Sequence, residues 1–150
     1  MQTDADTVQT EKYSVPFVER TGMRPLDKRR GYVNMLMPLT GNENHVGVMY
    51  MGAFTVLAEA AAATPAIDFL DKKRFFPIIK DMFVDFRKPA ASDVTAEYCL
   101  SAADITALQA DLERKGSAGY LAELEIKDAD HVTVAHAKVT VKLLSHGYKK

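Results

Sequence analysis

Glu59 is the side chain in this sequence best placed to do chemistry. It is the only charged residue in the 22-residue segment 46–67, which otherwise consists mostly of alanine, glycine, methionine and valine. A carboxylate enclosed by apolar residues is costly to keep, and burial raises its pKa and makes it a poised general base or nucleophile. The alternative is a partnered buried acid with no catalytic task. We favour the catalytic interpretation.

Three polar residues near Glu59 are further candidates. Asn44 is suited to orient a water or a carbonyl group, or equally to satisfy the backbone of a turn. His45 is suited to act as an acid or a base, and a loop residue without a role explains it as well. Thr55 stands four residues before Glu59, so on a helix its hydroxyl either holds the carboxylate or its water, or bonds back to the helix.

Hydrophobic patterning predicts the elements that position these residues. Residues 50–64 are rich in alanine and apolar on nearly all sides, which predicts a helix that is buried on most of them. An alternating segment at 31–40 predicts a strand before this helix. After it we expect four strands, in residues 75–87, 94–100, 120–127 and 132–144. Between the second and third of them we expect an amphipathic helix, in residues 104–115.

Two of these strands show irregular patterns. In 75–87 one face is predicted to be apolar and broken only by Lys80; it consists of Phe76, Ile78, Met82, Val84 and Phe86. In 132–144 the apolar parity changes, which a bulge near residues 135–137 or burial of both faces would explain. The simplest architecture is an α+β fold in which one antiparallel sheet wraps around one long buried central helix.

Composition limits the classes of function. The 150 residues suit a single domain, predicted at 14–150 behind a flexible arm at 1–13. A net charge of −1, from 19 basic and 20 acidic residues, argues against a nucleic-acid binder. The single cysteine and the histidine spacing support no metal site. The central acid argues against a membrane span in 46–67, and without a signal-peptide pattern we expect a cytoplasmic protein.

Three passages resemble the hotdog-fold acyl-CoA thioesterases, and the phenylacetate-pathway thioesterases in particular. In that pattern His-Gly-Gly-Ala is followed, seven residues after its second glycine, by Asp or Glu, and Gly52 and Glu59 keep this spacing, whereas Tyr50 and Met51 replace the family's His-Gly. The second passage, residues 84–90, resembles the family's hydrophobic-x-Phe-x-Arg-Pro-Ala strand end. The third, residues 128–135, resembles the last hairpin. The helix at 104–115 is more similar to an uncharacterised, thioesterase-like branch.

This resemblance implies a hotdog fold and an acyl-CoA (acyl-thioester) hydrolase. The carbonyl would bind backbone N–H groups at the start of the central helix, around Gly52. Glu59 would act as general base across a homodimer interface, with a pair of dimers as a further possibility, and coenzyme A would enter only as part of the substrate. The residues expected to bind substrate are Tyr50, Met51 and Thr55 at the helix start, and Arg87 and Lys88 on the phosphates.

Two other functions remain open. One is a non-catalytic protein that binds acyl thioesters and has lost the His-Gly pair. The other is a hydroxyacyl-thioester dehydratase or enoyl hydratase. Enzymes of that class in this fold have a histidine fourteen residues before the acid, as His45 is before Glu59. They also have a glycine at the position that Phe54 occupies here.

Overall fold

The computed structural model describes residues 15–148, so the arm predicted at 1–13 lies outside the described part of the chain. The described residues form an α+β fold with one six-stranded sheet. In chain order its elements are α1 (Pro16–Arg20), β1 (Arg24–Arg29), β2 (Tyr32–Met37), α2 (Met51–Ile67), β3 (Phe75–Phe86), β4 (Val94–Cys99), α3 (Ala102–Lys115), β5 (Ser117–Lys127) and β6 (Thr133–Ser145).

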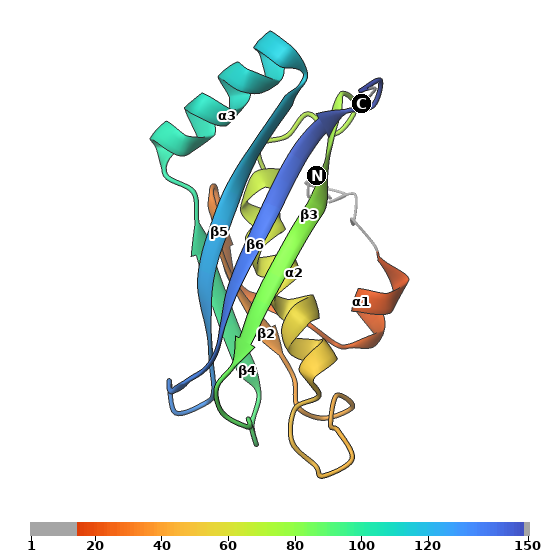
Figure 1. Ribbon diagram of the computed structural model, residues 1–150, viewed down its shortest axis with the longest axis vertical. Coiled ribbons are helices and arrows are strands. Elements are labelled where there is room, and N and C mark those ends of the chain that lie inside the picture. The colour runs from red at the N-terminus through yellow and green to blue at the C-terminus, as the bar shows by residue number, and fades with distance from the viewer. Residues whose placement is uncertain (1–14, 149–150) are drawn as a thin grey trace, which may run out of the picture.

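The six strands form a curled antiparallel sheet. Their order is β1-β2-β4-β5-β6-β3, and every neighbouring pair is antiparallel. Figure 1 shows β5, β6 and β3 as long neighbouring ribbons on the near side of α2. The twelve-residue β3 is an edge strand, so one of its sides has no strand partner within residues 15–148. The predicted antiparallel sheet is confirmed, and β3 is its longer open edge.

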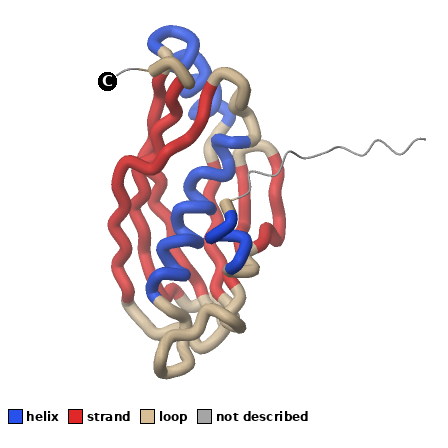
Figure 2. The backbone as a smooth tube through the Cα atoms, turned by 90° about the vertical axis from the view of Figure 1, so that its right-hand side faces the viewer, coloured by secondary structure: helices blue, strands red, loops and turns tan. Residues whose placement is uncertain are grey.

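The central helix α2 lies in the hollow of the curled sheet, with strands on both of its sides (Figure 2). One side of α2 is buried against the sheet, through residues such as Ala53, Leu57 and Ala61. The other side carries Met51, which is 56% exposed, and Glu59, which is also exposed. The expectation that most of this helix is buried is therefore confirmed, and the side around Glu59 is only partly covered in the single chain.

β1 is a strand that the sequence pattern does not predict. All six of its residues are exposed, so there is no alternation to detect, and Pro25 argues against a strand. Backbone pairing with β2 defines it, from Arg24 opposite Leu36 to Arg29 opposite Tyr32. The guanidinium of Arg29 also lies 4.1 Å from the centre of the Tyr32 ring.

A bulge at Lys80 overturns the prediction of one shared apolar face along β3. The register with β6 shifts between Ile79 and Asp81. Such a shift leaves one residue without a partner and exchanges the two faces of the strand beyond it. The partners across the sheet place Met82, Val84 and Phe86 on the side of α2, and Phe76 and Ile78 on the outer side.

The remaining predicted elements are confirmed with small changes at their ends. The phase change in β6 is a register shift opposite Ile126 and Lys127, which leaves Val134, one residue before the predicted place, without a partner in β5. α2 continues through Pro65 and ends three residues later than predicted. No helix in residues 15–148 is long and apolar enough to cross a membrane.

Candidate active site

The loop that leads into α2 is anchored by Asn42, which the sequence pattern does not single out. Its side-chain amide donates hydrogen bonds to the carbonyls of Thr21 and Pro38, both at 2.8 Å. Its own carbonyl accepts one from the backbone amide of Tyr50 at 2.8 Å. These bonds fix the residue directly before α2. An asparagine after Gly41 does signal a turn, but nothing in the sequence separates its role from that of Asn44.

Asn44 organises the tip of the same loop. Its Oδ1 accepts hydrogen bonds from the backbone amides of Val46 at 3.0 Å and Val48 at 3.2 Å. The turn interpretation of Asn44 is therefore confirmed for its oxygen. Its Nδ2 donates to no other described residue and remains available to a ligand. The neighbouring His45 is exposed, and no hydrogen bond joins it to any other residue in the described part of the chain.

The first turn of α2 presents free backbone donors. Tyr50 is the N-cap residue, its side chain makes no capping hydrogen bond, and no acidic residue lies in the first turn. Ala53 N donates to the carbonyl of Tyr50 at 2.9 Å, whereas the amides of Met51 and Gly52 have no acceptor among residues 15–148. Amides at the start of a helix, aligned with its dipole, favour a carbonyl oxygen that gains negative charge.

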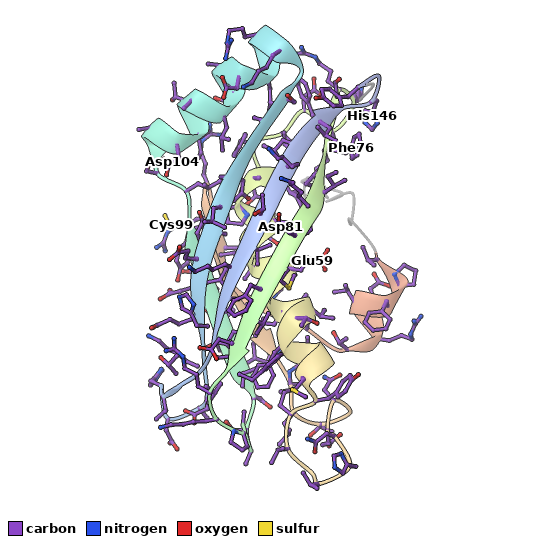
Figure 3. The ribbon with its side chains drawn as sticks, viewed as in Figure 1. Glu59, Phe76, Asp81, Cys99, Asp104 and His146 are labelled. Atoms are coloured by element: carbon purple, nitrogen blue, oxygen red, sulfur yellow. The ribbon has the colours of Figure 1, made fainter. Side chains whose placement is uncertain are left out.

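Glu59 lies near the middle of α2, at the side of the molecule where β3 forms the sheet edge (Figure 3). The surrounding protein removes part of its water, and this desolvation raises the pKa of Glu59 above its ordinary value of 4.5. Its carboxylate has no hydrogen-bond or ion-pair partner among the described residues. It is thus a carboxylate with a raised pKa on an uncovered helix face, a state suited to a general base.

Thr55 does not hold the Glu59 carboxylate in the single chain. Its hydroxyl donates to the carbonyl of Gly52 at 2.6 Å. Thr64 bonds back to Ala60 in the same way, also at 2.6 Å. A threonine on a helix can satisfy its own hydroxyl on the preceding turn, and this local bond replaces the contact that the sequence suggested. Binding of substrate by Thr55 stays a prediction.

The two predicted phosphate ligands are on the loop that follows β3. The backbone amides of Arg87 and Lys88 both donate to the carbonyl of Val134, at 2.9 and 3.0 Å. Farther along this loop, the carbonyl of Ala90 accepts a hydrogen bond from Met49 N at 2.8 Å. This bond joins the loop to the residues just before α2, so the basic pair lies at the same end of the molecule as the free helix amides.

Glu59 is separated from this group within one chain. It follows Gly52 by seven residues, which is roughly 10 Å along the helix axis. Asn44 is in the loop before α2, and Arg87 and Lys88 are in the loop after β3. Both loops lie at the lower end of Figure 1, at or beyond the start of α2. The basic residues 72–74 follow the opposite end of this helix, where Arg74 makes a bidentate ion pair with Glu113 at 2.7 and 3.0 Å.

Comparison with known sequences and structures identifies the family. Residues 11–143 match the family described as "Domain of unknown function (DUF4442)". The structure resembles that of the Pseudomonas aeruginosa protein PA5026, described as a protein of unknown function and probable thioesterase, with 39% identity and a TM-score of 0.81. The match covers 88% of this chain and 89% of that one. The chain therefore belongs to the DUF4442 family.

More distant solved structures share the fold. The thioesterase HI1161 of Haemophilus influenzae is 15% identical, with a TM-score of 0.67, and the match covers 88% of this chain and 87% of that one. A mutant structure of the thioesterase SAV0944 of Staphylococcus aureus is 20% identical, with a TM-score of 0.68 and coverages of 85% and 98%. These likenesses confirm the predicted hotdog fold. No curated protein matches the sequence.

Proposed function

We propose that this protein is a thioesterase that hydrolyses acyl-CoA or related acyl thioesters in a site shared by two copies of the chain. The observation that carries this proposal is the open face of α2. It presents free amides at Met51 and Gly52, and a carboxylate with a raised pKa at Glu59. The first group suits the thioester carbonyl, and the second suits the attacking water.

The distance between these groups requires the second copy. A water that attacks a carbonyl carbon must lie within about 3–3.5 Å of it, so the base and the carbonyl donors must lie within a few ångströms of the same substrate atoms. Gly52 and Glu59 are roughly 10 Å apart along one helix axis. A two-fold axis that sets two α2 helices side by side in opposite directions brings Glu59 of one copy to the helix start of the other.

Two open surfaces support such a pair. α2 leaves an apolar side only partly covered, with the half-buried Val56, Ala60 and Ala63 around Glu59. β3 leaves a twelve-residue strand edge unpaired within residues 15–148. Soluble proteins avoid leaving long edges and continuous apolar faces in water. Pairing of two copies along β3 covers both surfaces at once.

The spacing of Asn44 and Glu59 is a further support. Two structures of SAV0944 carry alanine in place of a glutamine at its position 32 and a glutamate at its position 47, which are fifteen residues apart. Asn44 precedes Glu59 by the same fifteen residues, and asparagine has the same amide group as glutamine. With its Oδ1 held by the loop, Asn44 offers Nδ2 to the thioester carbonyl.

The reaction then follows from these positions. The amides of Met51 and Gly52, with Asn44 Nδ2, polarise the carbonyl and stabilise the oxyanion that forms. Glu59 of the partner subunit accepts a proton from water as the oxygen attacks the carbonyl carbon. The carbon–sulfur bond breaks when the oxyanion collapses. The proton passes to the departing thiolate, which leaves a carboxylic acid and a free thiol.

The test is turnover of a panel of acyl-CoAs by the wild type and by Glu59→Gln. We expect the wild type to release free thiol, and the variant to be slower by a factor on the order of 10², as for the loss of a positioned base. Glu125→Gln is the matched control, because Glu125 lies on the outer face of β5. It should keep the wild-type rate.

Two results would overturn the proposal. Binding of acyl-CoA without turnover would identify a non-catalytic binding protein. Loss of the enoyl absorbance of crotonyl-CoA without release of thiol would identify a hydratase.

Phe54, which stands where that class has glycine, is buried and its ring lies edge-on to Phe86, with 5.8 Å between the ring centres. Filling that place with a packed ring favours hydrolysis over hydration.

A further inference from the structure

The ring of Tyr50 lies against the backbone of Gly52. A Cβ atom added to Gly52 would overlap Cε1 of this ring, and would lie 3.0 Å from its Cδ1 and 3.1 Å from its Cζ. The space that any other side chain would need at position 52 is therefore filled by Tyr50. The negative-φ helical backbone here gives no separate reason for glycine, because Gly52 is not among the glycines with positive φ.

The same ring stands at the surface of the candidate site. Tyr50 is 58% exposed, and its hydroxyl has no hydrogen-bond partner in residues 15–148. The ring thus lies against the first turn of α2 on one side and is open on the other. The open side of the ring therefore adjoins the first turn of α2, which carries the amides of Met51 and Gly52.

We infer that Tyr50 is the specificity-determining wall of the acyl site and that Gly52 is the positioning residue that seats it. This inference rests on the proposed function for the identity of the ligand, an acyl thioester. In this position the ring limits the width of the acyl group next to the thioester carbonyl. Straight-chain acyl groups pass it, and acyl groups branched at the carbon next to the carbonyl do not.

The selectivity test compares butyryl-CoA with isobutyryl-CoA. We expect Tyr50→Ala to raise kcat/KM for the branched substrate relative to the straight one by about tenfold, the scale of one methyl group in a shaped pocket. Tyr50→Phe keeps the ring and should keep the wild-type ratio. Gly52→Ala displaces the ring and should shift the ratio in the same direction as Tyr50→Ala. The double variant should show no further change.

Thermal unfolding tests the seating of the ring without any turnover. Alanine is the better helix former, so Gly52→Ala should raise Tm by a few degrees in the Tyr50→Ala background, where the space is free. In the wild type the same change must displace the ring, and Tm should stay level or fall. This reversal in the sign of the Tm change is expected even if the protein does not hydrolyse thioesters, so the two proposals can fail separately.

Either of two results would overturn the inference. One is an equal effect of Gly52→Ala on Tm in both backgrounds, which would show that the ring does not occupy the space above Gly52. The other is an unchanged butyryl-to-isobutyryl ratio in Tyr50→Ala, measured by turnover or, with S-alkyl-CoA thioethers, by calorimetric binding.

Discussion

Asp85 accepts a hydrogen bond from the Nε of Arg87 at 3.1 Å, between two side chains that are each about half exposed. Asp85 lies at the end of β3, and Arg87 is in the loop that follows it. The two terminal nitrogens of the guanidinium have no hydrogen-bond partner among the described residues. Asp85 therefore aims Arg87 and also competes with any anion for it.

Substitutions of Arg87 and of Asp85 should change the KM for acyl-CoA in opposite directions. If Arg87 binds a coenzyme A phosphate, Arg87→Ala should raise KM for acyl-CoA a few-fold with little change in kcat, because the contact is the same in the ground and transition states. Asp85→Asn should lower KM, because it removes a competing negative charge. A short acyl thioester that lacks the nucleotide is the control. Equal losses with both substrates would mean that Arg87 only supports the loop.

Asn44→Asp separates the two roles of Asn44. The carboxylate keeps an oxygen for the amides of Val46 and Val48 but loses the Nδ2–H donor. We expect the rate of thioester hydrolysis to fall by a factor on the order of 10², the cost of one oxyanion donor. Tm should change little, since the loop bonds remain. A folded variant with the wild-type rate would remove Asn44 from the site.

The raised pKa of Glu59 predicts how activity depends on pH. A general base must be ionised, so kcat/KM should fall as the pH is lowered through the pKa of Glu59. Because desolvation raises this pKa, the midpoint should lie above the ordinary 4.5. The acid limb should be absent from the residual activity of Glu59→Gln. A midpoint at or below 4.5 would contradict a desolvated base.

The same pKa predicts an effect on stability. Folding favours the protonated form, so the stability from this group is fully present below the pKa of the unfolded chain and is lost as pH rises through the raised folded pKa. Glu59→Gln mimics the protonated form. It should have a higher Tm than the wild type at neutral pH, and the difference should vanish in acid. An equal Tm at neutral pH would show that the carboxylate is fully solvated.

The open face of α2 predicts a homodimer. Light scattering should give twice the chain mass of 16.6 kDa for the wild type. Ala60→Arg puts a long charged side chain on the half-exposed face beside Glu59 and should return the mass to that of one chain. Ala107→Arg, on the exposed side of α3, should remain dimeric. A wild-type mass of one chain at micromolar concentration would contradict the shared site.

The sequence predicts the core of this fold because its core strands alternate. Val94, Ala96 and Leu100 face inward as the period of two requires. α3 ends at Lys115 as predicted, but it begins two residues before the predicted start, after a capping box of Ser101 and Asp104 that the pattern did not single out. β1 escapes prediction since it has no buried face. The prediction that Phe76 and Ile78 share a face with Met82, Val84 and Phe86 is wrong, because a bulge at Lys80 exchanges the two faces of β3. A lone lysine in an apolar run does not show where a bulge lies.

The candidate site can be predicted only in part from the sequence, because its geometry depends on contacts between distant segments and between chains. Glu59 is marked by its isolation in an apolar segment, and Gly52 by the resemblance to the thioesterase pattern. What surrounds them depends on packing between segments that are distant in the sequence, such as the ring of Tyr50 over Gly52. The exposure of Glu59 was missed because an alanine-rich helix is apolar on all sides whether one side or both are covered. Its pattern does not say which chain provides the cover.

A heterodimer of two inactive chains tests the shared site most directly. One chain carries Glu59→Gln and the other Asn44→Asp, and two different tags allow the mixed pair to be purified from co-expression. One of its two sites then combines an intact Asn44 with an intact Glu59 from the other copy, so its acyl-CoA hydrolysis should recover to about half of the wild-type rate. Recovery would establish a site built from both copies. A purified heterodimer no faster than its two inactive parents, beside an active wild type, would contradict it.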